Sequence, residues 1–390
     1  GIDEIKLVRK NLNWDYEPFK IPDDILNTWK KVGKKGIKLE KKWNIANKNN
    51  KNKIKKIFDT RFINNLKKEK IDAIKNPKEL ATRKSSELAL IAITKNNKIL
   101  IGGSADLAGS NNTKTKFQNI VKPGQFSGNY IHYGVREHAM CGIMNGLSLH
   151  SKLIPYGGTF LIFSDYCKPS IRLSALMGLK VIYIFSHDSI GLGEDGPTHQ
   201  PIEQLAGLRA IPNLNVFRPA DINETLECWE IALKSNGTPS AIALSRQKVP
   251  YINPKNTREN KSKKGAYVVN ITSHDSNVTI VASGTEVELA LKVQEKLKEN
   301  NIHSKVVSMP CMELFDKQPE DFRNDIIEKN SLVVTLEAGS VISWQKYIKN
   351  KGMNIGIDQF GESAPYKDVY NHFGLSEEKI TNFIQKKLRE

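Results

Sequence analysis

The sequence has few cysteines and no long apolar run, and each shortage excludes a class of protein. Only four of its 390 residues are cysteine, they lie far apart, and none forms a Cys-x-x-Cys pair. We therefore expect neither a disulfide framework nor a zinc site, and a reducing cytoplasm is the expected location. The longest apolar runs, such as residues 181–185, are far too short to cross a bilayer. No charged-then-apolar leader is seen, so neither secretion nor a membrane anchor is expected.

Acidic residues are scarce in one region, and the chain is basic as a result. The formal net charge is +17, and residues 1–80 hold 22 Lys and Arg against 11 Asp and Glu. A strongly basic segment can bind nucleic acid. Here the excess lies in a segment also rich in Asn and Ile, which is typical of a weakly constrained, solvated surface. We therefore expect no nucleic-acid partner, with binding of nucleic acid by residues 1–80 as an alternative.

The order of apolar and polar segments predicts an α/β protein. Residues 1–79 lack clear strands and are interpreted as a linker with exposed, Lys-rich helices. From residue 80 onward, strand-like runs alternate with helical patterns. The expected strands are residues 98–101, 180–185, 215–217 and 241–244, then 278–282, 304–308, 331–336 and 354–357. Short apolar runs separated by helices are typical of parallel strands buried on both faces. We predict two consecutive doubly wound, mainly parallel-sheet domains, residues 80–252 and 263–390, joined by the polar segment 251–265.

Two blocks of the first domain have residues suited to chemistry. Glu137 stands at the first turn of an expected apolar helix. It could simply offset the helix dipole there, or it could act on a ligand. Residues 186–201 form a long loop with three glycines, two histidines and three acids, which is costly to order without a role. His187 and His199 of this loop are either surface donors or donors to an oxygen-rich ligand.

A third feature is a set of aromatic residues, Phe160, Phe163 and Tyr166, which follow one another at helical spacing. Such a stripe belongs either to the core or to a cofactor platform. Polar loops also follow the expected strands at residues 102–106, 187–189 and 245–247. Because ligands of parallel sheets bind at the carboxyl ends of the strands, these loops predict a site at one edge of the sheet.

In their order along the chain, these motifs resemble those of the transketolases. The similar segments are residues 12–22, 102–107, 130–140, 157–160, 187–201, 218–221, 244–247 and 360–365. They span nearly the whole chain. Residues 135–138 (VREH) and 193–201 (GEDGPTHQP) differ from the usual motifs of deoxyxylulose-phosphate synthases and pyruvate-dehydrogenase beta subunits. Dihydroxyacetone synthases share much of the pattern.

The resemblance implies an activity and a set of site residues. Transketolases use thiamine diphosphate to transfer a two-carbon ketol unit reversibly from a ketose phosphate to an aldose phosphate, in the pentose phosphate pathway. The expected catalytic residues are Glu137, His187 and His199, with Glu137 bound to N1′ of the cofactor's aminopyrimidine. The expected cofactor-lining residues are Asp106, Leu107, Phe160, Phe163 and Tyr166, together with Glu137. Arg83, Ser110, His187 and Arg246 are expected around the sugar phosphate, Asp195 at the donor's C2 hydroxyl and His199 near the reacting carbonyl.

One part of the family pattern is not found. In transketolases an earlier domain, with a Gly-Asp-Gly motif and a downstream Asn, holds the diphosphate and its metal, Mg²⁺ or Ca²⁺. The sequence has neither motif. We therefore expect residues 1–79 to be a lead-in from a missing domain, no metal ligand in this chain, and a separate diphosphate-binding domain or subunit as partner. A homodimer or heterotetramer is expected. The alternatives are a dihydroxyacetone synthase, another thiamine-dependent transferase, or a non-catalytic remnant.

Overall fold

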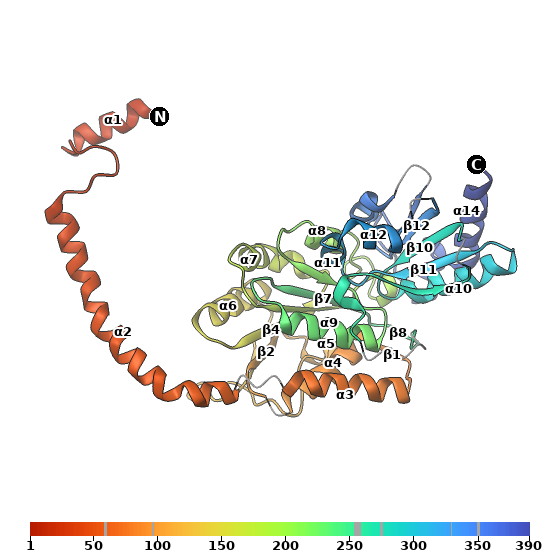
Figure 1. Ribbon diagram of the computed structural model, residues 1–390, viewed down its shortest axis with the longest axis horizontal. Helices are drawn as coiled ribbons and strands as arrows, with labels where there is room; N and C mark the ends of the chain where they lie inside the picture. The colour runs from red at the N-terminus through yellow and green to blue at the C-terminus, as the bar shows by residue number, and fades with distance from the viewer. Residues whose placement is uncertain (58–60, 96, 253–258, 274–275, 329, 349–351) are drawn as a thin grey trace. The chain divides into compact units, whose positions relative to one another are not determined.

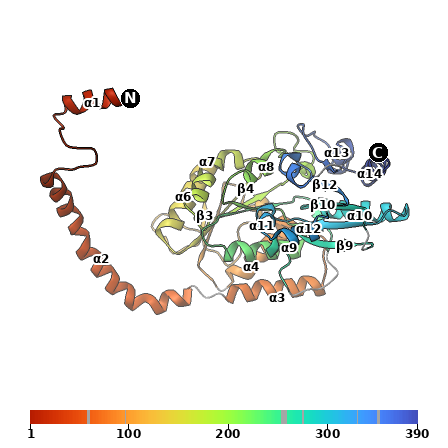
Figure 2. The ribbon, with the colours of Figure 1, turned by 45° about the horizontal axis from the view of Figure 1, so that its top comes forward.

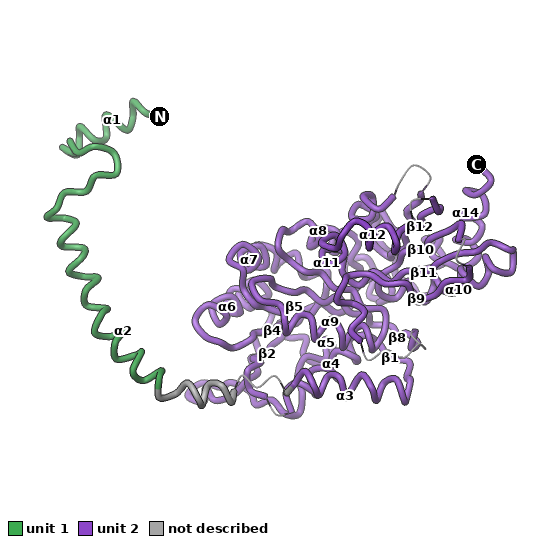
Figure 3. Tube along the Cα trace, viewed as in Figure 1, with its two compact units in different colours: residues 1–59 green, residues 60–390 purple. Residues whose placement is uncertain are grey.

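The computed structural model describes residues 1–57, 61–95, 97–252, 259–273, 276–328, 330–348 and 352–390. The chain divides into two compact units, residues 1–59 and 60–390 (Figure 3). Residues 253–258 of the expected linker lie outside the described residues. The domain limits predicted from the sequence stay a prediction.

The first unit consists of two helices, α1 (Ile2–Asn11) and α2 (Asp23–Ile57) (Figure 1). No residue of α1 is buried. On α2, Trp29, Leu39 and Trp43 are 71%, 69% and 63% exposed. Helices in proteins gain most of their stability by burying an apolar face. Within the described part of this unit, these large side chains have no such cover.

The second unit begins with helices and continues into a six-stranded sheet. Its strands are β2 (Leu100–Ser104), β3 (Tyr130–His132), β4 (Ile154–Phe160), β5 (Ile182–Ser186), β6 (Asn215–Phe217) and β7 (Ser240–Leu244). Their order is β3-β2-β4-β5-β7-β6, and all neighbours are parallel. Parallel neighbours need crossover connections, and these are helices on both faces of the sheet.

The helices of this sheet form two layers (Figure 2). They are α3 (Arg61–Lys75), α4 (Thr82–Thr94), α5 (Ala108–Asn111), α6 (Glu137–His150), α7 (Ser164–Leu176), α8 (Gln204–Arg209) and α9 (Ile222–Lys234). The helices α6, α7 and α8 share one core with Tyr183 and Phe185 of β5. On the other face α3, α4 and α9 pack together, and Trp229 of α9 donates a hydrogen bond of 2.9 Å to Ser86 of α4.

A five-stranded sheet follows in the same unit. Its strands are β9 (Tyr267–Ile271), β10 (Val278–Ala282), β11 (Ser304–Ser308), β12 (Leu332–Leu336) and β13 (Met353–Ile355). Their order is β13-β12-β10-β11-β9, with only β9 antiparallel to its neighbour. A two-stranded antiparallel pair, β1 (Leu80–Ala81) and β8 (Lys248–Val249), lies apart from both sheets.

Both faces of the five-stranded sheet are covered. Its helices are α10 (Glu286–Glu299), α11 (Met312–Asp316), α12 (Glu320–Ile326), α13 (Tyr366–His372) and α14 (Glu377–Arg389), with 3-10 helices η1 (Ile190–Leu192), η2 (Ser262–Lys264) and η3 (Val341–Tyr347). Ile280 of β10 belongs to the core with α10 and α14, whereas Val281 belongs to the core with α11 and η3. Successive residues of a strand point to opposite faces, so an all-apolar strand serves two cores. The prediction of two mainly parallel α/β sheets after a helical lead-in is confirmed.

Several strand ends differ from the prediction by one to three residues, and the end of β2 differs most. The expected strand 98–101 is β2, and β2 continues through Gly102 and Gly103 to Ser104. The glycines do not end the strand, because close packing requires them there. A Cβ atom on Gly103 would lie 2.1 Å from the Tyr133 ring, and one on Gly102 would lie 2.2 Å from the Tyr156 ring.

Among the described helices, none combines the length and the apolar character needed to cross a bilayer.

Candidate active site

Four neighbouring strands of the six-stranded sheet end at one edge. In the register of the sheet, Ser104 of β2 lies opposite Gly158 of β4, Phe160 opposite Ser186 of β5, and Ser186 opposite Leu244 of β7. The loops that begin at residues 105, 161, 187 and 245 therefore leave the sheet side by side. The carboxyl ends of parallel strands are the usual place for ligands.

His187 is held in an unusual backbone conformation directly after β5. Its φ is +61°, a left-handed value that side-chain-bearing residues adopt rarely. Its ring nitrogen Nδ1 lies 2.8 Å from Ser186 Oγ, and that hydroxyl donates to Asn111 Oδ1 at 2.7 Å. A hydroxyl has one proton, so Nδ1 of His187 must be the donor to Ser186. The neutral ring therefore has its proton on Nδ1 and leaves Nε2 as an acceptor.

Aromatic rings surround His187 and His199. The Phe160 ring lies 3.8 Å from the His187 ring and 6.2 Å from the His199 ring, between centroids. Phe163 lies 5.8 Å from Phe160, 5.7 Å from His199 and 6.1 Å from Tyr166. The five rings thus form a continuous set.

The aromatic residues do not share one helix, so the helical reading of their spacing is corrected. Phe160 is the last residue of β4, Phe163 caps the start of α7, and Tyr166 lies within α7. Phe160 is buried, whereas Tyr166 is 64% exposed. The strand β4 ends at Phe160 and α7 begins at Ser164, so the three-residue spacing of these aromatic residues spans a turn from strand to helix.

Positive charge accumulates beside His187. Burial, with the charges of Arg83, Arg246 and His199, lowers the pKa of His187 from 6.5 to about 3. Burial and Arg246 also lower the pKa of Arg83. Arg83 donates from Nη1 to the carbonyl of Ser110 at 2.8 Å, and its buried Nε has no partner among the described residues. Two guanidiniums with spare donors suit a phosphate dianion.

Glu137 begins α6 and is 8% exposed. Its backbone carbonyl accepts a weak bond from Cys167 Sγ at 3.9 Å, but no partner for its carboxylate is found among the described residues. Met140 and Cys141 on the same helix are buried beside it in an apolar core. A buried carboxylate normally has a hydrogen-bonding partner. This one fits a ligand that brings its own donor, as the aminopyrimidine of thiamine does.

The remaining expected residues lie at the same edge with fewer contacts. Asp106 follows β2 with a φ of +62° and is exposed, and Leu107 starts α5 with its backbone nitrogen 3.2 Å from Ser104 Oγ. Asp195 is exposed on the loop 193–196. Within the described chain, no hydrogen bond or ion pair joins the Asp106 or Asp195 side chain to the other site residues.

Sequence reasoning missed residues that brace the site. Asn111 and Ser186 orient His187, as described above. Gln200 donates from Nε2 to the carbonyls of Gly193 and Glu362, each at 2.9 Å, and Ser363 Oγ donates to the carbonyl of Glu194. The segment 360–365 thus packs on the loop that contains Asp195. In the sequence, segment 360–365 was noticed only as one of the motifs similar to those of the transketolases, and such a similarity does not say which residues the segment contacts.

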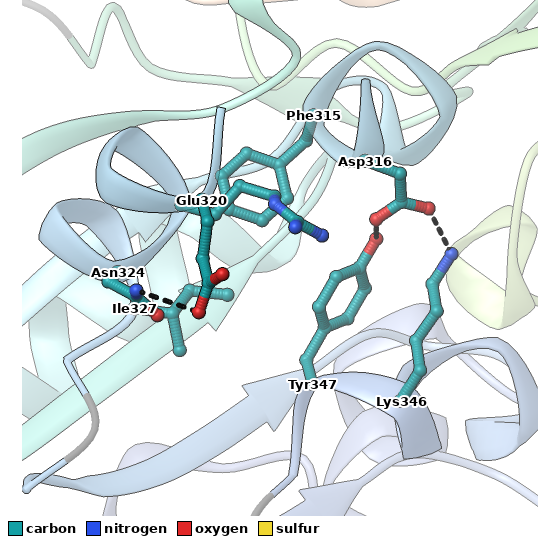
Figure 4. Close-up of a pocket in the computed structure, with 8 residues that line it drawn as sticks. Phe315, Asp316, Glu320, Asn324, Ile327, Lys346 and Tyr347 are labelled. Carbon is teal, nitrogen blue, oxygen red and sulfur yellow. Dashed lines mark hydrogen bonds and ion pairs between the residues drawn. The ribbon is translucent and has the colours of Figure 1, made fainter. Parts of the chain in front are cut away.

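A cavity of about 330 Å³ lies elsewhere, among α11, α12 and η3 (Figure 4). Its charged residues are balanced. Asp316 pairs with Lys346 and accepts from the Tyr347 hydroxyl at 2.8 Å, Glu320 lies opposite, and Arg323 also lines the cavity. None of the residues expected at the active site lines this cavity. No group of three or more His, Cys, Asp or Glu suited to a metal occurs among the residues that the structure describes.

Three protein-family models match the chain. The transketolase pyrimidine binding domain matches residues 78–251, and the transketolase-like TK C-terminal domain matches residues 265–376. The transketolase thiamine diphosphate binding domain matches residues 1–66. The expectation that this last domain is missing is therefore partly wrong. The expectation rested on the Gly-Asp-Gly motif, which is only one part of that domain, and residues 1–66 match without it.

Individual relatives agree with the family models. A transketolase of Sinorhizobium medicae is 45% identical over 387 residues, which cover 97% of this chain and 56% of that protein. A crystal structure of Pichia stipitis transketolase mutants, in complex with xylulose 5-phosphate, has a TM-score of 0.87 at 34% identity, and the match covers 100% of this chain and 59% of that one. A split-gene transketolase, described as an inactive β4 tetramer, has a TM-score of 0.66 at 25% identity. That match covers 80% of this chain and 99% of the other. The chain therefore spans little more than half the length of the first two relatives and nearly the full length of the third.

Proposed function

The chain belongs to the transketolase family, and from this premise we propose that it supplies the pyrimidine-binding and sugar-phosphate-binding side of a ketol-transfer site. The reaction is transfer of a two-carbon ketol unit from a ketose phosphate to an aldose phosphate. The observation that carries the proposal is Glu137, a residue only 8% exposed whose carboxylate has no described partner, on the same domain as the Arg83, Arg246 and His187 cluster.

Thiamine diphosphate, when bound, would supply a nucleophilic thiazolium carbon and an electron sink for the transferred ketol unit. Glu137 has a narrower task. Its carboxyl binds the N1′ position of the aminopyrimidine and holds a proton there, in an apolar setting where water does not compete for it. Phe160, Phe163 and Tyr166 wall the pyrimidine, with Asp106 and Leu107 at the end of β2.

The positive cluster binds the phosphate of the sugar. Arg83 and Arg246 donate to the phosphate oxygens, and Ser110 supplies a hydroxyl nearby. His187 stays neutral at physiological pH because its pKa is about 3. Neutral His187 offers Nε2 as an acceptor, which suits a sugar hydroxyl beside the phosphate. Asp195 binds the C2 hydroxyl of the donor, and His199 contacts oxygens near the reacting carbonyl.

The diphosphate and its Mg²⁺ or Ca²⁺ need residues beyond the 66 that match the diphosphate-binding family. We propose that these residues come from the rest of that domain, as part of a longer protein or as a separate subunit. The split-gene relative supports this view, since a chain matched over 99% of its length is described as inactive. We propose further that a second copy of this chain packs on α6 and α7. Their outer face exposes Ile143, Leu149, Leu173 and Leu176, at 48%, 61%, 48% and 71%.

A coupled assay tests the function. Xylulose 5-phosphate and ribose 5-phosphate are supplied with thiamine diphosphate and Mg²⁺, with and without a separately expressed diphosphate-binding domain. We expect activity only in the mixture. Glu137→Gln keeps the shape of the side chain and should lower activity by about 100- to 10,000-fold, the usual contribution of proton transfer.

The same variant separates a catalytic from a structural role for Glu137. Because Glu137 is largely buried and its carboxylate has no described partner, its neutral replacement should leave the thermal stability unchanged or raise it. Full activity of the chain alone, or of Glu137→Gln in the mixture, would overturn the proposal. Activity with dihydroxyacetone-forming substrates but not with ribose 5-phosphate would instead favour a dihydroxyacetone synthase.

A further inference from the structure

A buried ion-pair network lies between the two large sheets, next to the active-site loop. Arg218 follows β6 and is fully buried. Its Nε donates to Asp188 Oδ2 at 2.9 Å, and its Nη1 donates to the carbonyl of Ser283 at 2.9 Å. It also forms an ion pair with Glu286, the first residue of α10. Arg218 therefore joins the loop after β5 to the residues after β10.

The partners on the five-stranded sheet are themselves held firmly. Glu286 accepts from the Tyr370 hydroxyl at 2.7 Å and from the backbone nitrogen of Ala338 at 3.0 Å. Glu337 accepts two bonds from Arg209, at 2.7 and 2.8 Å, and one from Trp344 at 2.8 Å. Burial alone would raise the pKa of Glu337, but Arg209 and Arg218 lower it to about 2. Glu337 is thus ionised, and several elements hold it and Glu286 in place.

On the other side, the network reaches His187 through one peptide bond. Asp188 is the next residue, and it is buried with only Arg218 as its described side-chain partner. Ser189 lies 3.5 Å from the Tyr370 hydroxyl and accepts from the backbone nitrogen of Gly191 at 3.2 Å. A left-handed residue other than glycine persists only where its surroundings over-determine it. Ser186 and Asn111 hold the His187 ring, and the Asp188 pair holds the backbone that follows.

We propose that Arg218 is a positioning residue of the active site: by holding Asp188, it keeps His187 in its left-handed conformation with Nε2 toward the ligand. The five-stranded sheet therefore shapes the site through Ser283 and Glu286 without contacting the substrate. The catalytic consequence of this proposal rests on the proposed function of His187 in ligand binding. The conformational consequence does not, and can be measured without any ligand.

Three variants separate positioning from general stability. Asp188→Ala removes the contact with Arg218. Asp188→Asn keeps the shape and an oxygen that can accept from Arg218 Nε, so it should rescue. Glu337→Gln is the control for a general charge change in the same network, because it removes an acid that lies 3.8 Å from Arg218 Nη1 and leaves the bond from Arg218 Nε to Asp188 in place. Arg218→Lys tests the same contact should Asp188→Ala fail to fold, since a single ammonium replaces the guanidinium that reaches both acids.

The first readout is the imidazole of His187 by nitrogen NMR on histidine-labelled full chain, assigned by the signal lost in His187→Asn. In the unaltered protein we expect the Nδ1-protonated neutral ring, with no titration above about pH 5. The groups that face it are Arg83, Arg246 and His199. In folded Asp188→Ala or Arg218→Lys, the ring should leave Ser186, change to the Nε2-protonated form and titrate between about pH 5 and 7.

The second readout is the coupled assay of the complete enzyme. Asp188→Ala should lower kcat/KM for xylulose 5-phosphate by about 100-fold, the effect of misplacing a site residue by roughly 1 Å. Asp188→Asn should restore most of it. An unchanged His187 signal in folded Asp188→Ala overturns the proposal, and so does an equal change in Glu337→Gln. A changed His187 signal with normal turnover upholds the positioning role and counts against the proposed function of His187.

Discussion

Arg246 offers a clean test of phosphate binding, because its side chain is exposed and its guanidinium makes no hydrogen bond with the described residues. It follows β7, and its charge contributes to the lowered pKa of both Arg83 and His187. Arg246→Gln removes the charge with little cost to folding, since surface substitutions usually change stability by less than about 0.5 kcal/mol. Any large effect on binding would then report the ligand contact.

The expected loss can be worked from the contact. A hydrogen bond from a charged group contributes about 1.5 to 3 kcal/mol. At about 1.4 kcal/mol for each tenfold change, KM for a sugar phosphate should rise by roughly 10- to 150-fold. The kcat should change little, because the phosphate lies away from the bond that breaks. The pKa of His187 should rise, since one of the charges that lowers it has been removed.

The assay is the coupled ketol-transfer reaction of the complete enzyme with xylulose 5-phosphate, and with xylulose itself as a donor without phosphate. Lys248→Gln is the matched control. Lys248 is an exposed cation two residues from Arg246, and this substitution also removes one positive charge. We expect the KM increase only for the phosphorylated donor and only in Arg246→Gln. Equal increases in KM in the two variants would mean that Arg246 acts only through its general positive charge. An unchanged KM in Arg246→Gln would refute the assignment of Arg246 to phosphate binding.

Two further predictions concern stability and assembly. Burial, with the neighbouring Asp221, raises the pKa of Glu224 from 4.5 to about 7, and burial raises that of Asp221 to about 6. The two protonated carboxyls make their full contribution to the stability of the folded state below about pH 4. This contribution is lost as the pH rises through 6 and 7. The free energy of unfolding should therefore fall by up to about 3 kcal/mol for Glu224 between pH 4.5 and 8. Urea titrations at several pH values should show a shallower decline of this free energy with pH in Glu224→Gln than in the unaltered protein. An equal decline would contradict the reasoning. Leu176→Glu, on the exposed face of α6 and α7, should shift the chain from dimer to monomer in sedimentation experiments. The matched change Leu388→Glu on α14 should not. A dimer that survives Leu176→Glu would place the dimer contact elsewhere.

Strands were predictable where the apolar runs are short and bounded. The structure has β6, β10 and β11 with the bounds expected from the sequence. The end of β2 was wrong, because Gly102 and Gly103 were interpreted as a loop although they pack beneath tyrosine rings. A glycine that gives room and a glycine that makes a turn look the same in one sequence.

The expected site residues could be named by resemblance, but their orientation could not. The bond from Ser186 to Asn111 joins residues 75 positions apart, and the pair of Arg218 with Glu286 joins residues 68 apart. Neither leaves a local pattern in the sequence. The choice of the protonated nitrogen on His187 depends on the first of these bonds, so it became visible only in the structure.

The start of the chain shows a different limit. Its helical nature was predicted from composition, and α1, α2 and α3 are helices. Its family assignment was inferred from the absence of one motif, and the match of residues 1–66 to the diphosphate-binding family corrects that inference. A missing motif reports on a few residues, whereas a family match reports on a whole segment.

The network around Arg218 also constrains how this chain can be recombined with its relatives. A chimera that takes one sheet from each of two parents inherits Asp188 and Arg218 from one, and Ser283, Glu286 and Glu337 from the other. Gly284 must come with them, since a Cβ atom there would lie 2.8 Å from the Arg218 side chain. Parents that differ in charge at Asp188, Arg218, Glu286 or Glu337 would yield hybrids with a buried, unpaired charge between the two sheets. Libraries that shuffle donor specificity should therefore exchange the strand-end loops and keep the seam from a single parent.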